Sequence, residues 1–198
     1  MADSRKPLRH HLPSGPFVAI ATIVVVLLIA VFIYSGIYNI GADAPHSRPV
    51  YTMLEGLRDR SIAAHARGIT VPADLESPAH VSAGAGLYGE MCQGCHLAPG
   101  AERTEISRGL YPQAPELAKG TDLTPAQQFW VIKHGVKLTA MPAWGKTHPD
   151  ALIWDMVAFL QKMPGMTPAA YKAAVATAPE DHDAMMKVAH GHTGEGHV

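Results

Sequence analysis

Residues 81–96 read VSAGAGLYGEMCQGCH, and this stretch decides what kind of fold the chain can build. Its first part contains no proline and is rich in alanine and glycine, so a helix there would let a second helix approach closely on one side. The stretch ends in two cysteines, separated by two residues, and a histidine. We expect a helix that leads directly into two thiols and an imidazole.

The run from Cys92 through Gln93, Gly94 and Cys95 to His96 is the attachment pattern of a c-type haem. Each of the two thiols can add to a vinyl group on the same porphyrin edge, and the adjacent imidazole can then bind the iron. A thioredoxin-like pair would need a strand before it, and a zinc knuckle would need two further ligands nearby. Because neither context is present, we expect one covalently bound haem c.

The overall composition excludes several other classes of protein. The chain has 198 residues, with 16 Lys plus Arg against 17 Asp plus Glu, which gives a formal net charge of −1. A nucleic-acid binder would normally carry a basic excess on one face. With only 2 Cys, neither a disulfide framework nor a four-thiolate zinc site can form.

Residues 17–40 read FVAIATIVVVLLIAVFIYSGIYNI, a run without charged side chains that is long enough to cross a hydrocarbon core of about 30 Å. We predict a single transmembrane anchor there. Basic residues precede the run and Asp43 follows it, so residues 1–16 should lie in the cytoplasm of a bacterium and everything after Asp43 in the periplasm. The basic residues are Arg5, Lys6 and Arg9.

A cleaved signal peptide is the alternative to a retained anchor in the inner membrane. Ala42 and Ala44 are small residues at the two positions that a signal peptidase inspects. Pro45 follows them, and the apolar run is longer than the 7 to 15 residues or so of a signal h-region. The retained anchor is therefore favoured, and both interpretations export the rest of the chain.

We divide the exported part into a periplasmic linker at 41–80, a haem domain at 81–163 and a C-terminal extension at 164–198. The linker contains an amphipathic helical pattern that suits a spacer, lying on the haem domain or the bilayer surface, better than a docking helix. One side of this pattern carries Met53, Leu54, Leu57, Ser61 and Ile62, and the other side carries Glu55, Arg58, Asp59 and Arg60.

Capping patterns predict three helices after the haem motif. Thr124, Pro125 and Gln127 begin one that Gly135 ends. Thr147 with Asp150 begins an amphipathic helix that reaches about Lys162, and Thr167 with Pro168 begins a short one through Val175. No run of alternating apolar and polar residues indicates a β-sheet, so we predict a small all-α domain.

Residues 81–163 resemble the class I cytochromes c. The resemblance rests on the haem motif, on Gly84, Tyr88 and Cys92 at four-residue intervals, on the pair Met141-Pro142, and on Trp154 as the closing-helix aromatic that packs on the first helix. It implies the small all-α class I fold, here after one transmembrane helix, with His96 and Met141 as the axial iron ligands. His134 and His148 are the rivals of Met141 as imidazole ligands.

The surroundings of the haem are predicted from the same resemblance. His96 should donate its free ring N–H to a backbone carbonyl, which fixes its tautomer. The family uses the proline of a Pro-x-Leu step, which Pro115 matches, while Pro99 competes from the turn after His96. An insertion is expected between residues 103 and 113. The candidates for contacts with the propionates are Tyr111, Trp144, Arg103 and Arg108.

Charge is balanced across the haem domain, but Lys133, Lys137 and Lys146 bracket Met141. Such a positive rim would steer an acidic redox partner, although solvated lysines without a partner explain it equally well. The C-terminal tail could bind copper through imidazole and thioether groups, although a disordered tail is the simpler interpretation. Its candidates are His182, Met185, Met186, His190, His192 and His197.

These patterns together predict a membrane-anchored, one-electron carrier of the respiratory chain rather than an enzyme. One alternative is a cytochrome subunit that is permanently bound within a dehydrogenase or oxidase complex. Another is a haem enzyme or gas sensor with an open axial site.

Overall fold

The computed structural model describes residues 14–179, which form helices and connecting turns with no strand. The all-α prediction is thereby confirmed. The chain divides between Ala44 and Pro45 into two compact units, and each is described by itself. The N-terminal residues 1–13 and the histidine-rich tail with its predicted copper ligands lie outside the described residues.

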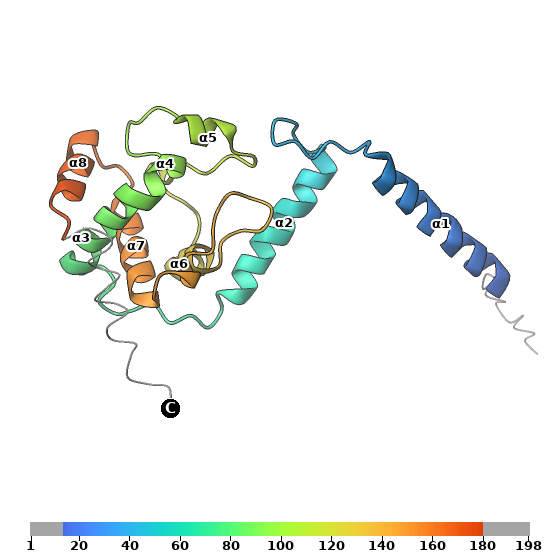
Figure 1. Ribbon diagram of the computed structural model, residues 1–198. Coiled ribbons are helices and arrows are strands. Elements are labelled where there is room, and N and C mark those ends of the chain that lie inside the picture. Colours follow the sequence, from blue (N-terminus) through green and yellow to red (C-terminus); the bar gives the residue numbers. More distant parts are fainter. Residues whose placement is uncertain (1–13, 180–198) are drawn as a thin grey trace, which may run out of the picture. The chain divides into compact units, whose positions relative to one another are not determined.

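The first unit contains helix α1, Gly15–Ser35, which is drawn in blue in Figure 1. Among the described residues it is the one helix that is long and apolar enough to cross a membrane, and none of its residues is buried. Gly36 ends it with a left-handed φ of 64°, a conformation that glycine adopts without strain. The helix therefore stops before residue 40, where the predicted span ends.

The second unit begins with helix α2, Arg48–His65, at the position of the predicted amphipathic helix. Ile62, in the last turn of α2, and Ala66, the residue directly after the helix, are both buried. Met53 and Leu57, expected on the same apolar side, are instead 63% and 65% exposed. The buried side is thus limited to the C-terminal end of α2, which lies near α6.

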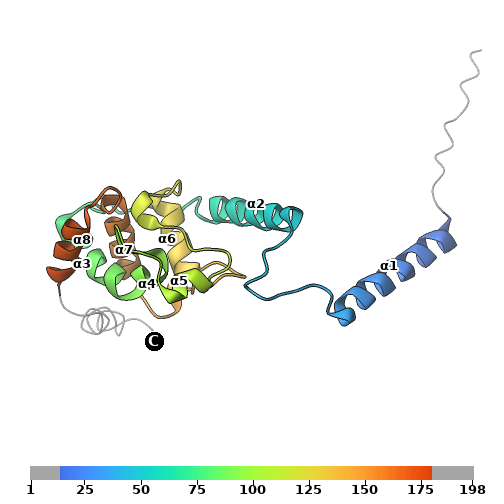
Figure 2. The same cartoon turned by 90° about the horizontal axis from the view of Figure 1, so that it is seen from above.

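Helices α3, Pro78–Leu87, and α7, Asp150–Lys162, cross and pack against each other beside α8 (Figures 1 and 2). A Cβ atom on Gly84 of α3 would lie 1.9 Å from the backbone oxygen of Asp155, so only glycine permits this approach. The side of α7 that faces inward contributes fully buried residues, among them Ile153, Val157 and Phe159.

Two further helices match their predicted starts. Helix α6, Pro125–His134, has the complete capping box of Thr124 and Gln127 and ends at Gly135. Helix α8, Pro168–Ala176, is capped by the Thr167 side chain, which accepts a hydrogen bond from the Ala170 N–H. Three short elements lack a sequence prediction: α5, Glu105–Gly109, and the 3₁₀ turns η2, Leu117–Lys119, and η3, Trp144–Lys146.

The predicted cap of α7 is wrong. Thr147 bonds backward to the Trp144 carbonyl and to the His148 ring, because η3 occupies the residues before it. Pro149 is the N-cap residue instead, and no side chain caps this end.

The predicted packing role of Trp154 also needs correction. Its ring stacks on Phe129 of α6, with centroids 4.2 Å apart, whereas the closing-helix ring beside Tyr88 is Phe159 at 5.6 Å. Phe159 is also the α7 side chain nearest to the glycine at the α3–α7 crossing. Phe159 of α7 thus faces α3 and the residues directly after it, and Trp154 faces α6.

Candidate functional site

The chain enters the predicted haem motif through a turn of π-helix, η1, Tyr88–Cys92. The N–H of Gln93 bonds to the Tyr88 carbonyl across this wider turn, and helix α4, Gln93–His96, follows directly. Single π turns of this kind are frequent at functional sites. The turn places both cysteines within one short helical segment.

The two cysteines are free thiols and are partly buried. Burial is the main cause that raises the pKa of Cys92 to about 12, and the neighbouring Cys95 raises it further. A catalytic redox cysteine has a lowered pKa, so Cys92 does not have the character of a thioredoxin-type nucleophile. Within the described residues, no group of three or more His, Cys, Asp or Glu side chains is arranged to hold a metal ion.

The ring of His96 is held in one orientation by the backbone of Pro115. Its Nδ1 lies 2.8 Å from the Pro115 carbonyl oxygen, and because a carbonyl can only accept, Nδ1 carries the proton. Burial lowers the pKa of His96, with the bond to Pro115 acting in the opposite direction. The neutral ring therefore keeps a free Nε2 lone pair, which is the form that binds iron.

The backbone reverses immediately after His96. Leu97 has a φ of 66° and a ψ of 148°, a region that residues other than glycine rarely occupy. Its carbonyl accepts a hydrogen bond of 2.7 Å from the buried hydroxyl of Tyr88. The sequence offers no signal for Leu97, since a leucine does not suggest a positive φ, yet it ends the segment that carries the ligand.

Met141 lies in a tight loop between α6 and η3. Its N–H donates to the Thr139 hydroxyl at 3.1 Å, and its carbonyl accepts from the Val136 N–H at 3.2 Å. The loop presses on Gly135, where a Cβ would be 2.7 Å from the Met141 oxygen. The Met141 side chain is partly buried against the hydrophobic core.

The two rival ligands have other neighbours. The ring of His134 is tilted against that of Trp130, with centroids 5.0 Å apart. His148 is buried, and its Nδ1 lies 2.8 Å from the Thr147 hydroxyl. These contacts engage both imidazoles within their own segments.

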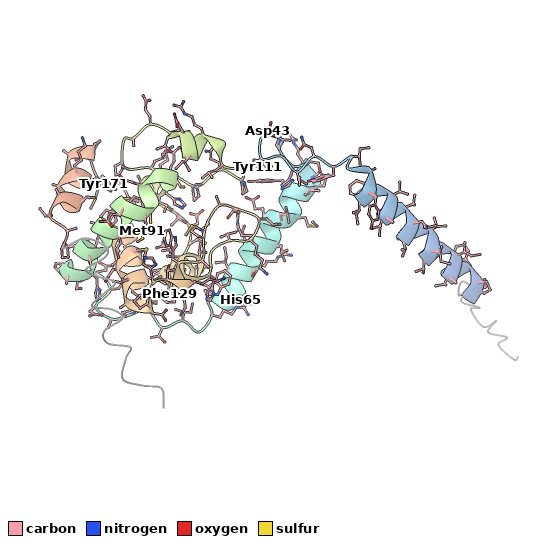
Figure 3. All side chains as sticks on the ribbon, viewed as in Figure 1. Asp43, His65, Met91, Tyr111, Phe129 and Tyr171 are labelled. Atoms are coloured by element: carbon pink, nitrogen blue, oxygen red, sulfur yellow. The ribbon has the colours of Figure 1, made fainter. Side chains whose placement is uncertain are left out.

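The remaining candidates near the haem are dispersed. Pro99 lines a small hollow of about 260 Å³ together with Lys119. The Tyr111 hydroxyl accepts the N–H of His46 at 2.8 Å, so it meets the start of the second unit (Figure 3). Trp144 is partly buried against the core, and Arg103 pairs with Glu116 at 3.1 Å.

One lysine of the predicted positive rim is neutralised. The ammonium group of Lys133 lies 2.6 Å from the Asp150 carboxylate, whereas Lys137 and Lys146 are exposed. The Lys133–Asp150 pair borders a hollow of about 540 Å³ that Phe129 and other aromatic side chains line. Figure 3 labels Phe129 and His65 of this lining. The rival ligand His134 lines this hollow, whereas Cys92, Cys95, His96 and Met141 do not.

The side chains of the motif fit a covalently bound haem. Both thiols are free for thioether bonds, and the His96 ring presents an unprotonated Nε2 while its other nitrogen is engaged. A second, neutral sulfur donor is available from the Met141 loop.

Residues 79–160 match the family model described as cytochrome c oxidase, cbb3-type, subunit III. The match covers less than half of the chain and shows that this part is a class I-like c-type cytochrome domain. Such a domain implies a covalently bound haem and a role in electron transfer. No curated protein and no solved structure matches the chain.

Proposed function

We propose that this chain is a one-electron carrier whose haem c is attached to Cys92 and Cys95 and ligated by His96 and Met141. The observation that carries this proposal is the bond from His96 Nδ1 to Pro115 directly beside two free thiols. In that arrangement the Nε2 atom of His96 is free to bind the haem iron, and the two thiols beside it can bind the porphyrin.

A bound haem would supply an iron that accepts and releases one electron. His96 would bind the iron through the imidazole nitrogen of a fixed tautomer, and Met141 would supply a soft thioether that favours ferrous iron. With both ligands from the protein, the iron would be closed to substrates and gases. These roles suit electron transfer rather than catalysis.

The haem domain would work on the periplasmic side of a bacterial inner membrane, anchored by α1 with its N-terminus in the cytoplasm. The apolar length of α1 and the basic residues before it support this orientation. Intact mass of the protein from the membrane fraction tests the anchor, since cleavage after Ala44 would remove it.

A second candidate is a subunit held permanently in a respiratory oxidase or dehydrogenase complex. The description of the matched family, an oxidase subunit, favours it specifically. Purification in mild detergent separates the two functions. A haem protein that elutes alone, as a single 21.1 kDa polypeptide with its haem, supports the carrier, and co-elution with other chains at fixed stoichiometry supports the subunit.

The ligand set is tested by replacing Met141. Wild-type protein should retain its colour after denaturation and solvent extraction, and it should show the weak long-wavelength band of sulfur-to-iron ligation. In Met141→Ala this band should disappear, and the ferrous protein should bind carbon monoxide. Met53→Ala, an exposed methionine of α2, is the matched control and should behave as wild type. Rapid carbon monoxide binding by the wild type would instead indicate an open axial site.

A further inference from the structure

Helix α8 packs against one side of α3 and η1, where glycine residues leave room for it. A Cβ on Gly86 would lie 3.0 Å from the Ala178 Cβ, and one on Gly89 would lie 2.9 Å from Val175 Cγ1. Both glycines belong to the segment that leads into the haem motif, Gly86 in α3 and Gly89 in η1. Helix α8 itself begins after residue 160, beyond the part of the chain that matches the family model.

Tyr171 is the residue through which α8 reaches the interior. Its side chain is 4% exposed, and its ring meets that of Tyr88 edge-on with centroids 6.1 Å apart. The ring of Phe159 lies at the same centroid distance of 6.1 Å. The three rings therefore form one cluster from η1, α7 and α8, and Figure 3 shows where Tyr171 lies.

The Tyr171 hydroxyl continues into a chain of hydrogen bonds that ends in the π turn. It donates to Gln93 Oε1 at 3.2 Å, and Gln93 Nε2 in turn donates to the Gly89 carbonyl. Gln93 lies between the two cysteines in the sequence, and Gly89 lies within η1. One amide group thus joins the C-terminal helix to both ends of the turn that presents the thiols.

We propose that Tyr171 and Gln93 are positioning residues that hold the π turn, and with it Cys92, Cys95 and His96, in the geometry that the haem requires. A side chain inserted into a helical ladder stabilises a π turn, because it satisfies a carbonyl that the wider turn leaves without its usual partner. The proposal rests on the proposed haem function for its consequence at the iron, but the hydrogen-bond chain is a property of the polypeptide itself.

The experiment compares the full-length holoprotein in detergent with Tyr171→Phe, Gln93→Leu and the double variant. Tyr171→Phe keeps the ring cluster and removes only the hydroxyl. We expect hydrogen exchange of the backbone amides in residues 89–96 to rise roughly two- to tenfold in each single variant, as the loss of one ordinary hydrogen bond predicts. The reduction potential should shift in the same direction in both, and the double variant should change no further than Gln93→Leu.

The matched control is Tyr51→Phe, which removes the hydroxyl of an exposed tyrosine on α2. Exchange in α6 reports on general loosening and should stay at the wild-type value in every variant. The inference is overturned if the two single effects add, if exchange rises uniformly, or if the variants equal the wild type in both measurements. Failure of the proposed function is a different result, since the wild type would then carry no covalent haem by intact mass.

Discussion

His80 and Asp155 form the pair that joins α3 to α7 beside their closest approach. The His80 Nδ1 lies 2.5 Å from an Asp155 carboxylate oxygen, and its Nε2 lies 3.5 Å from the carboxylate of Asp74. The hydrogen bond to Asp155 is the main cause that raises the pKa of His80 above 6.5, while burial raises the pKa of Asp155. The positive charge of a protonated His80 therefore offsets the cost of burying the negative charge of Asp155.

This pair predicts a pH-dependent stability. Because the folded-state pKa of His80 is raised, its contribution is complete below the unfolded value of 6.5 and is lost as the pH rises through the folded value. We expect His80→Gln to lower the free energy of unfolding by about 1 to 3 kcal/mol at about pH 6, and by less at about pH 9. Denaturant titrations of both proteins at the two pH values measure this, and a difference that grows toward high pH would contradict the assignment.

Residue identity alone indicated much of the haem motif but little of what supports it. Cys92, Cys95 and His96 are recognisable because their chemistry requires adjacency in sequence. Tyr171 lies 78 residues from Gln93, so their hydrogen bond depends on how α8 folds back and has no local pattern. The positive φ of Leu97 is hidden for a similar reason, since leucine does not favour it and the Tyr88 hydroxyl that bonds to the Leu97 carbonyl lies nine residues earlier.

At the scale of helices, the crossing of α3 and α7 leaves no space at Gly84. We expect Gly84→Ala to destabilise the fold by about 1 to 3 kcal/mol or more, because its new Cβ would meet the backbone oxygen of Asp155. Gly56→Ala is the matched control, a helical glycine of α2 with nothing within 4 Å, and should be neutral or stabilising by up to about 1 kcal/mol. Equal thermal midpoints for the two variants would refute the close crossing.

The loop that carries Met141 makes a second prediction. Gly135 has a φ of 66°, and a Cβ there would lie 2.7 Å from backbone atoms of Met141 and Pro142, whereas a Cβ on Gly165, with a φ of 82°, would meet nothing within 4 Å. Both Gly→Ala substitutions should cost about 1 to 2 kcal/mol for the left-handed backbone. Only Gly135→Ala should also weaken the sulfur-to-iron band, since it alone displaces the loop. If Gly165→Ala weakened the sulfur-to-iron band as well, the band would not report on the contact between Gly135 and the Met141 loop, and the prediction would be contradicted.

Helix ends were predictable where a side chain supplies the cap. Thr124 and Gln127 satisfy each other's backbone groups locally, so the start of α6 is encoded in four residues. Thr147 carries the same pattern, but a 3₁₀ turn competes for its hydroxyl and the helix begins later. The π turn has no local signature either, because the Gln93 side chain and the distant α8 stabilise it.

For the molecule as a whole, charge balance leaves local charge to decide how redox partners approach. Lys133 is paired with Asp150, so Lys137 and Lys146 carry the predicted positive rim. We expect Lys137→Glu with Lys146→Glu to slow reduction of the anion ferricyanide by the ferrous protein roughly two- to tenfold at low ionic strength, with the difference shrinking in salt. Lys172→Glu with Arg67→Glu changes the charge equally at exposed positions away from Met141, and stopped-flow traces that match for both pairs would show that net charge alone matters.

The packing of α8 affects how the protein should be shortened for study. A fragment cut back to residues 79–160 would remove the covering of Gly86 and Gly89 and leave the Tyr88 ring beside water. Such a fragment would keep its colour, because the thioether bonds to the haem would remain. Its reduction potential would nevertheless change, because the π turn that carries the cysteines would have lost its contacts with α8. Any minimal version that is meant to represent the parent should therefore extend through Ala178, whose methyl group closes the contact with Gly86.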